Sequence, residues 1–325
     1  RLHADGKVSA TNLSIGAERA TTAVRSEGTL ARQVELLKFF QDERYVANQF
    51  SICASLGAPI FFATGHHGVV VNMSGPPGAS KSTTLYTAAS MWGDPLAFCI
   101  NGTASGATAR ARDNRMAVTA NLPQMVDEIT RMASKDAADL AMSVTQSEPR
   151  LRLHVDGSER RSVNSNKSTI MLSTANTSLY TVLSGERADS TAESMRVFEI
   201  QFHTNHVHQK READEYMREL RHNYGHIGEL FINYVVQHLD EVTARVRAVM
   251  HAVDTTAKIE SGERFWSAAG AASIVACEVA NKLGLLSYNP VEMYNWVCHT
   301  QIPAMRGSIT EQYTSPIGVL AEYME

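Results

Sequence analysis

The chain has 325 residues, enough for about two domains at roughly 150 residues each. Apolar residues make up 44% of it and charged residues 20%, the usual proportions of globular proteins, which excludes a disordered chain. Its 30 basic and 34 acidic side chains give a formal net charge of −4, which excludes a polybasic protein but allows a local basic channel. Four scattered cysteines are too few for a disulfide framework, so we expect reduced thiols and a cytoplasmic protein.

The first part of the chain alternates short apolar strands with helices. Residues 45–80 lack Asp, Glu, Lys and Arg, but their histidines, glycines and prolines leave no apolar span of roughly 20 residues, so we expect no membrane segment. Helices are expected at 81–92, 104–120 and 135–145, and the Asp156-Gly157 turn predicts a hairpin between 150 and 167. The expected strands are 68–74, 96–100, 122–126, 169–173 and 196–202. This alternation predicts an α/β fold with a parallel sheet covered by helices on both faces.

The last third of the chain contains no good strand pattern. Helices are expected at 209–222, 226–251 and 261–283, with another near 290–300. We therefore predict an all-helical C-terminal domain after the α/β core. The predicted organisation is an N-terminal arm or linker (1–30), an α/β core (31–203), a helical domain (204–305) and a linker to a following module (306–325).

The strongest signal is a phosphate-loop (P-loop) motif that follows one predicted strand and opens a predicted helix. In such a loop the backbone N–H groups face the phosphates of a nucleotide, and the helix N-terminus favours their negative charge. Lys81 is expected to reach the β- and γ-phosphates, and the Ser82 hydroxyl to bind Mg²⁺. The expected nucleotide-binding residues are Gly75, Pro76, Pro77, Gly78, Ala79, Ser80, Lys81, Ser82 and Thr83.

One position departs from this motif. Ser80 stands before Lys81, where glycine is usual because it lets the backbone approach a phosphate without a Cβ. Serine is tolerated there if its φ angle is negative. Because of this departure one further interpretation stays open, in which the chain is a degenerate nucleotide-binding scaffold.

An acidic pair follows the predicted strand at 122–126. An NTPase needs one carboxylate near Mg²⁺ and another to activate the attacking water. We assign Asp127 to the metal and Glu128 to the water. Acidic residues also favour the first turn of a helix, so the pair alone is also compatible with a helix start.

Two further segments offer polar groups to the same site. Asn176 follows the strand at 169–173, at the sheet edge where ligands bind, and its amide can orient the same water as Glu128, the role called sensor one. Arg187 and Arg196 precede the strand at 196–202. Ring NTPases insert an arginine from a neighbouring subunit to stabilise the transition state, and either of these arginines can serve. The alternative for Asn176 is a turn after the strand, and the alternative for each arginine is a surface position or a structural ion pair.

These stretches resemble helicase-like ATPases of phages and mobile elements, which are found beside primases and polymerases and look like superfamily-three or AAA+ ring motors. The resemblance covers roughly residues 30–285. The helical stretch "HNYGHIGELFINYV" (222–235) is similar to the part that follows the ATPase core there. The sequences that carry the resemblance are the P-loop (75–83), "AASMWGDP" (88–95), "NLPQMVDEIT" (121–130) and "ESMRVFEI" (193–200).

The resemblance implies an α/β P-loop NTPase of the AAA+ or superfamily-three type, acting with ATP and Mg²⁺ as a helicase on single-stranded DNA. It also implies a ring, hexameric in such motors, a primase or polymerase module as partner, no membrane, and the cytoplasm of a bacterial host. In such motors a hairpin before the sensor strand holds the phosphate backbone in the pore. The basic residues of that region here are Arg150, Arg152, Arg160, Arg161 and Lys167.

A second hypothesis remains open. The near-neutral net charge also suits an AAA+-like remodelling or assembly ATPase that does not act on DNA. Charge reversal of Arg160 and Arg161 separates the two, because it should abolish DNA binding only in the helicase.

Overall fold

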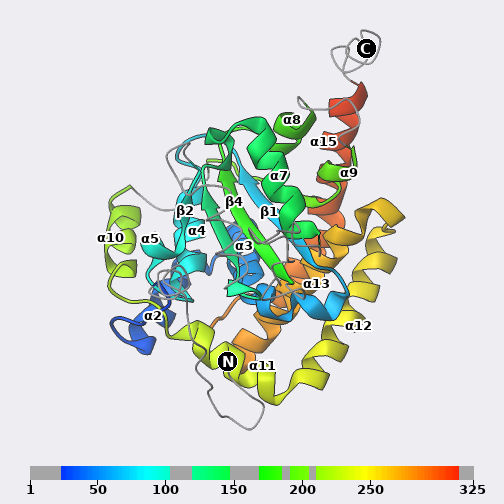
Figure 1. Cartoon of the computed structure of the whole chain (residues 1–325). Helices are drawn as coiled ribbons and strands as arrows, with labels where there is room; N and C mark the ends of the chain where they lie inside the picture. The colour runs from blue at the N-terminus through cyan, green and yellow to red at the C-terminus, as the bar shows by residue number, and fades with distance from the viewer. Residues whose placement is uncertain (1–22, 103–118, 147–167, 185–190, 205–209, 315–325) are drawn as a thin grey trace, which may run out of the picture.

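The computed structural model describes residues 23–102, 119–146, 168–184, 191–204 and 210–314. In these residues five parallel strands form one sheet with the order β2-β3-β4-β1-β5 (Figure 1). The parallel α/β fold predicted from the sequence is confirmed. The strands are β1 (Gly68–Ser74), β2 (Ile100–Asn101), β3 (Gln124–Asp127), β4 (Thr169–Ala175) and β5 (Val197–Gln201).

The central strands are buried on both faces, as their composition requires. Every residue of β1 and β4 is buried, because helices cover the parallel sheet on both sides. The expected strand at 96–100 is wrong for most of its length. Pro95–Phe98 forms the short helix α5, in which the Asp94 carboxylate accepts hydrogen bonds from the backbone N–H groups of Leu96 and Ala97. A capping aspartate followed by proline is a helix start, and it outweighs the short apolar run.

Helices lie on both faces of the sheet, with α7 in front of it and α3 and α13 behind it in Figure 1. Short 3₁₀ segments join several of them. The expected helices at 81–92 and 135–145 correspond to α4 and α7, whereas nearly all of 104–120 lies outside the described residues. The helices of the N-terminal part are α2 (Leu30–Leu37), α3 (Val46–Gly57), α4 (Lys81–Ser90), α5, α7 (Ser134–Thr145), α8 (Leu179–Ser184) and α9 (Thr191–Ser194).

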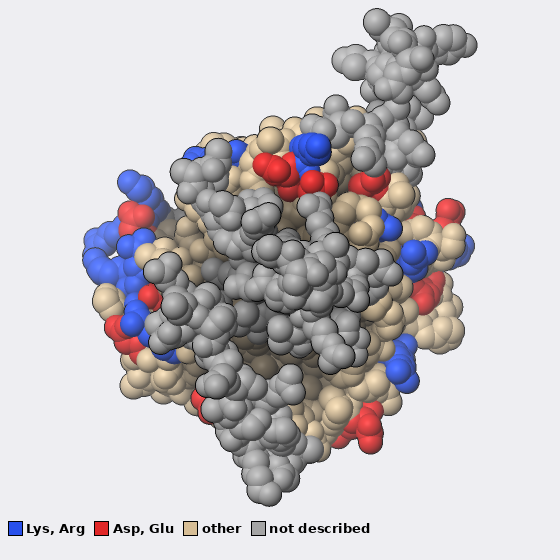
Figure 2. Space-filling model, viewed as in Figure 1, with Lys and Arg blue, Asp and Glu red and all other residues tan. Residues whose placement is uncertain are grey.

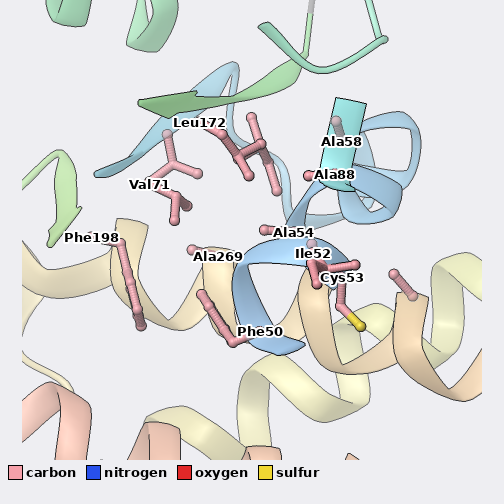
Figure 3. Packing of buried hydrophobic residues seen from close by; sticks show 14 of the residues in the cluster. Phe50, Ile52, Cys53, Ala54, Ala58, Val71, Ala88, Leu172, Phe198 and Ala269 are labelled. Carbon is pink, nitrogen blue, oxygen red and sulfur yellow. The ribbon is translucent and has the colours of Figure 1, made fainter. Parts of the chain in front are cut away.

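The helices after residue 204 share their core with the sheet. The indole N–H of Trp266 donates to the carbonyl of Val197 on β5 at 2.9 Å. Phe50 of α3 stacks on Phe198 with ring centroids 4.8 Å apart, and Ala269 of α13 lies on the same side of the sheet (Figure 3). The C-terminal helices are α10 (Lys210–Leu220), α11 (Ile227–Gln237), α12 (Leu239–Ala257), α13 (Arg264–Lys282), α14 (Pro290–Trp296) and α15 (Ile302–Thr314).

Small residues allow α3 and α13 to approach closely. A Cβ added at Gly57 would lie 3.0 Å from the carbonyl of Ala272, tighter than nearly all real Cβ contacts, so the helices would have to shift apart slightly. A π-helical turn, Val297–Gln301, joins α14 to α15, and α15 continues past residue 305 to Thr314. The side chain of Gln301, the last residue of the π-helical turn, donates to the backbone carbonyl of Glu199 on β5.

Among the described residues one helical stretch, Glu43–Thr64, is long and apolar enough to cross a membrane, but 78% of its most apolar 18-residue window is buried inside the fold. It includes α3 and packs against the sheet. Burial within the protein explains its composition, since a core helix needs apolar residues on all sides.

Charges of both signs alternate over the face shown in Figure 2. α10, at one edge of this view, mixes the two signs along its length. Its charged residues are Lys210, Arg211, Arg218, Glu212, Asp214, Glu215 and Glu219.

Candidate nucleotide-binding site

The predicted site residues stand at the carboxyl ends of three neighbouring strands. The P-loop follows β1, Asn176 follows β4, and Asp127 ends β3. Because β4 lies between β1 and β3, Asn176 stands between the loop and the acidic pair. The strand order thus brings together groups that are far apart in the sequence, at the edge of the sheet where α/β proteins bind ligands.

The P-loop needs glycine at its first position. Gly75 has a φ angle of 145°, and an added Cβ would meet the carbonyl oxygen of Phe202 at 2.3 Å. Gly78 has a φ angle of 82°, with open space around it. Pro76, Pro77 and Gly78 are exposed. The loop therefore leaves the first strand through backbone conformations that side chains do not favour.

Ser80 adopts the left-handed backbone conformation that the motif usually reserves for glycine at this position. Its φ angle is 62°, so the expectation that serine is tolerated here through a negative φ angle is wrong. Its side chain makes no capping hydrogen bond to α4, while its carbonyl accepts from the hydroxyl of Thr84 at 2.8 Å. A left-handed residue with a Cβ carries strain of roughly 1–2 kcal/mol. The serine departs from the motif in side chain but keeps its backbone shape.

Lys81 is buried, with 6% of its surface exposed, and its ammonium donates to three oxygens. These belong to the carbonyls of Gly75 (2.7 Å) and Pro76 (2.8 Å) and to the side chain of Asn176 (3.3 Å). Burial lowers the pKa of Lys81, and the nearby carboxylates of Glu128 and Asp127 oppose that shift. The lysine thus lies between the P-loop and the acidic pair, where its charge can meet a phosphate.

Asp127 is held by three hydroxyl groups. Ser82 and Thr174 donate to one of its carboxylate oxygens at 3.1 and 2.7 Å, and Tyr86 donates to the other at 2.8 Å. Burial and the bond to Asp127 raise the pKa of Tyr86, which stays a neutral donor. Ser82 and Asp127, which the sequence analysis assigns separately to Mg²⁺, thus lie in contact.

Two of these partners were not predicted. Tyr86 lies one helical turn after Ser82 on α4, a spacing that places both side chains on one face and could have revealed it. Thr174 lies two residues before Asn176 in β4. It also binds the backbone N–H of Glu128 at 2.8 Å, so a single hydroxyl joins both acidic residues to the central strand.

Glu128 leaves the strand in a left-handed conformation with a φ angle of 58°. The Asn176 amide donates to both oxygens of its carboxylate at 3.0 and 3.1 Å. Arg131 contacts the same carboxylate at 3.1 Å, although its own side chain is 59% exposed. Asn176 therefore bridges Lys81 on one side and Glu128 on the other.

The other predicted residues divide into two groups. Arg196 precedes β5, is half-buried, and its guanidinium lies 2.6 Å from the sulfur of Met142. Thr83 lies in the first turn of α4, where its carbonyl accepts from Thr87. Arg187 and the five basic residues of 150–167 lie outside the described residues. The structure thus assembles the P-loop, the acidic pair and Asn176.

A cavity of about 900 Å³ opens beside the P-loop. One wall comes from the loop and the end of β5, and the other from the start of α3 and the C-terminal helices. Its lining includes Tyr45, Asn48, Ser80, Glu199, Trp296 and Gln301.

The site offers hard oxygen ligands. Among the described residues no group of three His, Cys, Asp or Glu could hold a metal by itself. Mg²⁺ is usually bound by one or two protein oxygens together with substrate phosphates, and the adjacent oxygens of Ser82 and Asp127 fit that requirement. The residues present therefore suit Mg²⁺ in company with a nucleotide.

The chain is similar to one described family and, in its fold, to a solved structure. Residues 5–164 match a family described as "Domain of unknown function (DUF927)", a range that includes the P-loop and the acidic pair. No curated protein matches the chain significantly. The fold is similar to that of a solved structure, "SCCmec type IV Cch - active helicase", with a TM-score of 0.69 and 16% sequence identity. The similarity covers 92% of this chain and 55% of that one, so the chain spans about half the length of that protein.

Proposed function

We propose that this chain is an ATPase domain that hydrolyses ATP with Mg²⁺ and drives a nucleic-acid motor. The observation that supports it best is the contact network at the sheet edge. Asn176 joins Lys81 to Glu128, and Ser82 joins the P-loop helix to Asp127. Cation, metal-side carboxylate and water-side carboxylate, the three charges that phosphoryl transfer needs, thus meet at one place.

Each residue has a defined part in hydrolysis. The backbone N–H groups of the P-loop and of the first turn of α4 bind the phosphates, and Lys81 neutralises their charge. Ser82 and Asp127 would hold Mg²⁺, which supplies further charge neutralisation on the phosphates when bound. Glu128 accepts the proton of the attacking water on a carboxylate oxygen, while the Asn176 amide holds Glu128 and the water in line.

The nucleoside would occupy the cavity beside the loop. A volume of about 900 Å³ is ample for a base and ribose, and the half-buried side chain of Trp296 offers apolar surface for a base. Ser80 and Gly75 line the same cavity, which makes it continuous with the phosphate position.

The motor part of the proposal is a helicase or translocase of a phage or mobile element. We propose that it acts on single-stranded DNA as a ring, hexameric by analogy with superfamily-three and AAA+ motors, beside a primase or polymerase. Support comes from the similar fold of a protein described as an active helicase. Arg187 or Arg196 would act on the ATP of a neighbouring subunit, and the basic residues of 150–167 would hold the DNA. The alternative is an AAA+-like remodelling ATPase that does not act on DNA.

ATP hydrolysis by the wild type and by Lys81→Ala tests the ATPase. We expect the variant to lose roughly 100-fold or more in turnover, because removing one electrostatic contact to a transition state typically costs that much. Lys282→Ala, at a lysine on α13 that is 59% exposed and pairs with Glu241, is a matched control and should keep full activity. Equal rates in wild type and Lys81→Ala would refute the assignment.

Single-stranded DNA at low salt tests the motor. We expect it to stimulate hydrolysis, and we expect charge reversal of Arg160 and Arg161 to Glu to remove the stimulation without changing the basal rate. Hydrolysis that DNA does not stimulate would favour the remodelling ATPase.

A further inference from the structure

Glu199 is a buried carboxylate at the site to which the proposed hydrolysis gives no part. It lies on β5, in register with Asn72 of the neighbouring strand β1, and 6% of its surface is exposed. Burying a carboxylate is costly unless hydrogen bonds compensate for the lost water. The identity of its partners therefore indicates what this carboxylate stabilises.

The partners come from the two segments that carry the catalytic groups. The backbone N–H of Leu179 donates to both oxygens of Glu199 at 3.1 and 2.9 Å, and that of Tyr180 donates at 3.4 Å. The nearby hydroxyls of Ser74 and Ser178 favour the charged form of this carboxylate and partly offset the rise that burial causes in its pKa. Ser74 is the last residue of β1, directly before the P-loop, and Ser178 lies two residues after Asn176.

Asn176 needs such an anchor because it is exposed at the end of β4. Its side chain bridges Lys81 and Glu128 over distances of 3.0–3.3 Å, so a small shift of its backbone would break one contact or the other. Between Asn176 and Leu179 there are only two residues. A carboxylate that holds Leu179 therefore restricts where Asn176 can lie.

Glu199 is itself fixed from the opposite side. The side chain of Gln301, in the π-helical turn of the C-terminal helices, donates to its backbone carbonyl. Glu199 and Gln301 both line the cavity beside the P-loop. The anchor of Asn176 is thus built into the wall of the proposed nucleoside pocket.

We propose that Glu199 is a positioning residue for ATP hydrolysis: its carboxylate ties the segment after Asn176 to β5, the strand that pairs with β1 before the P-loop, and so holds Asn176 against Glu128. The inference rests on the proposed function. It goes beyond it by assigning control of the water-orienting amide to a residue that takes no part in the chemical step.

The first test separates turnover from binding. In Glu199→Gln the amide oxygen can still accept from Leu179 and Tyr180, so we expect kcat to fall about 10-fold. In Glu199→Ala all acceptors are lost, and we expect kcat to fall about 100-fold, the typical cost of a misplacement by about 1 Å. KM and the affinity for a slowly hydrolysed ATP analogue should change less than about threefold. A general loss of folding would instead lower the active fraction and leave kcat per folded molecule unchanged.

The second test is a double-mutant cycle with Asn176→Ala. If Glu199 acts through Asn176, Glu199→Gln should lower kcat by less than about twofold once Asn176 is gone, because residues that act as a unit are non-additive. An equal loss in both backgrounds would overturn the proposal. If the Glu199 variants do not fold, Ser178→Ala, which removes a single hydroxyl from the same carboxylate, should lower kcat in the same direction.

The matched control is Glu263→Gln. Glu263 is also a buried carboxylate, 4% exposed, but its partners are Arg306 and the backbone N–H of Glu260. We expect it to lower stability and leave kcat unchanged. The failures are distinguishable: no hydrolysis by the wild type overturns both this inference and the proposed function, whereas an active wild type, an inactive Lys81→Ala and a fully active Glu199→Gln overturn only the inference.

Discussion

Substitution of Ser80 by glycine tests whether the P-loop backbone carries strain. The φ angle of 62° places Ser80 in the left-handed region, which costs a residue with a Cβ roughly 1–2 kcal/mol. Glycine removes this cost but adds conformational entropy to the unfolded chain, worth roughly 0.5–1 kcal/mol. The carbonyl of Ser80 keeps its bond to Thr84 in either case. Ser80→Gly should therefore raise the free energy of unfolding by about 0.5–1 kcal/mol.

The assay is urea denaturation followed by circular dichroism, with ATP turnover measured beside it. Lys258→Gly is a matched control, because Lys258 also has a left-handed φ angle, 51°, but lies at the end of α12. It should give a similar gain with no change in turnover. Gly78→Ala is the reverse test: an added Cβ meets nothing within 4 Å, so only the φ angle of 82° penalises it, and we expect a loss of about 1 kcal/mol. A loss of stability in Ser80→Gly would refute the reasoning.

Three further changes test the groups around the acidic pair. Tyr86→Phe removes a hydroxyl that holds Asp127 at 2.8 Å, so it should cost about 1 kcal/mol in stability and raise the Mg²⁺ concentration for half-maximal hydrolysis; an unchanged Mg²⁺ requirement would contradict the role of this contact. Arg131→Gln frees the Glu128 carboxylate from an exposed ion pair, worth at most about 1 kcal/mol, so basal hydrolysis should rise by no more than about fivefold, whereas a fall would mean that Arg131 positions the carboxylate. Burial raises the pKa of Glu199 from 4.5 to about 7, so between these pH values the folded chain keeps a proton that the unfolded chain releases. The free energy of unfolding of the wild type should therefore fall by up to roughly 3 kcal/mol as the pH rises from about 4.5 through 7. Denaturation of Glu199→Gln, measured over the same pH range, should lack this loss.

The parts of the fold that sequence predicts well are those encoded by local signals. The run Gly68–Ser74 has three consecutive valines between a glycine and a Gly/Pro-rich loop, a pattern that predicts a buried strand, and the structure has β1 there. The second strand was mispredicted because Leu96 and Phe98 are apolar in a segment whose cap, Asp94, favours a helix. Side-chain capping there decides between two structures that hydrophobicity alone does not distinguish.

The packing of the C-terminal helices could not be read from the sequence. A pattern of helices without strands predicts a helical unit, but it does not say against what the unit packs. Here Trp266 bonds β5 and the small residues of α13 lie against α3, so one core serves both parts. Such contacts join residues that are far apart in the chain, and no local pattern specifies them.

The φ angles of Ser80 and Glu128 were equally out of reach. Neither residue type favours the left-handed region, and both adopt it because the surrounding contacts hold them there. For Glu128 these contacts are the hydrogen bond from its backbone N–H to the Thr174 hydroxyl and the hydrogen bond that the Asn176 amide donates to its carboxylate. Both partners belong to β4 and the residue after it. The position of the predicted base is therefore set by the strand that lies between it and the P-loop.

The two acidic residues are held by different kinds of partner, and the difference fits the roles proposed for them. The partners of Asp127 are three neutral hydroxyls, which can rotate and give way to a cation without leaving an unpaired charge. Glu128 is held by a fixed amide and by an exposed arginine, an arrangement that keeps the direction of the carboxylate while one partner can leave. The sequence supplies two adjacent carboxylates of nearly equal chemistry. Their surroundings, and above all Thr174 and Asn176 on β4, make one suited to a metal and the other to a water.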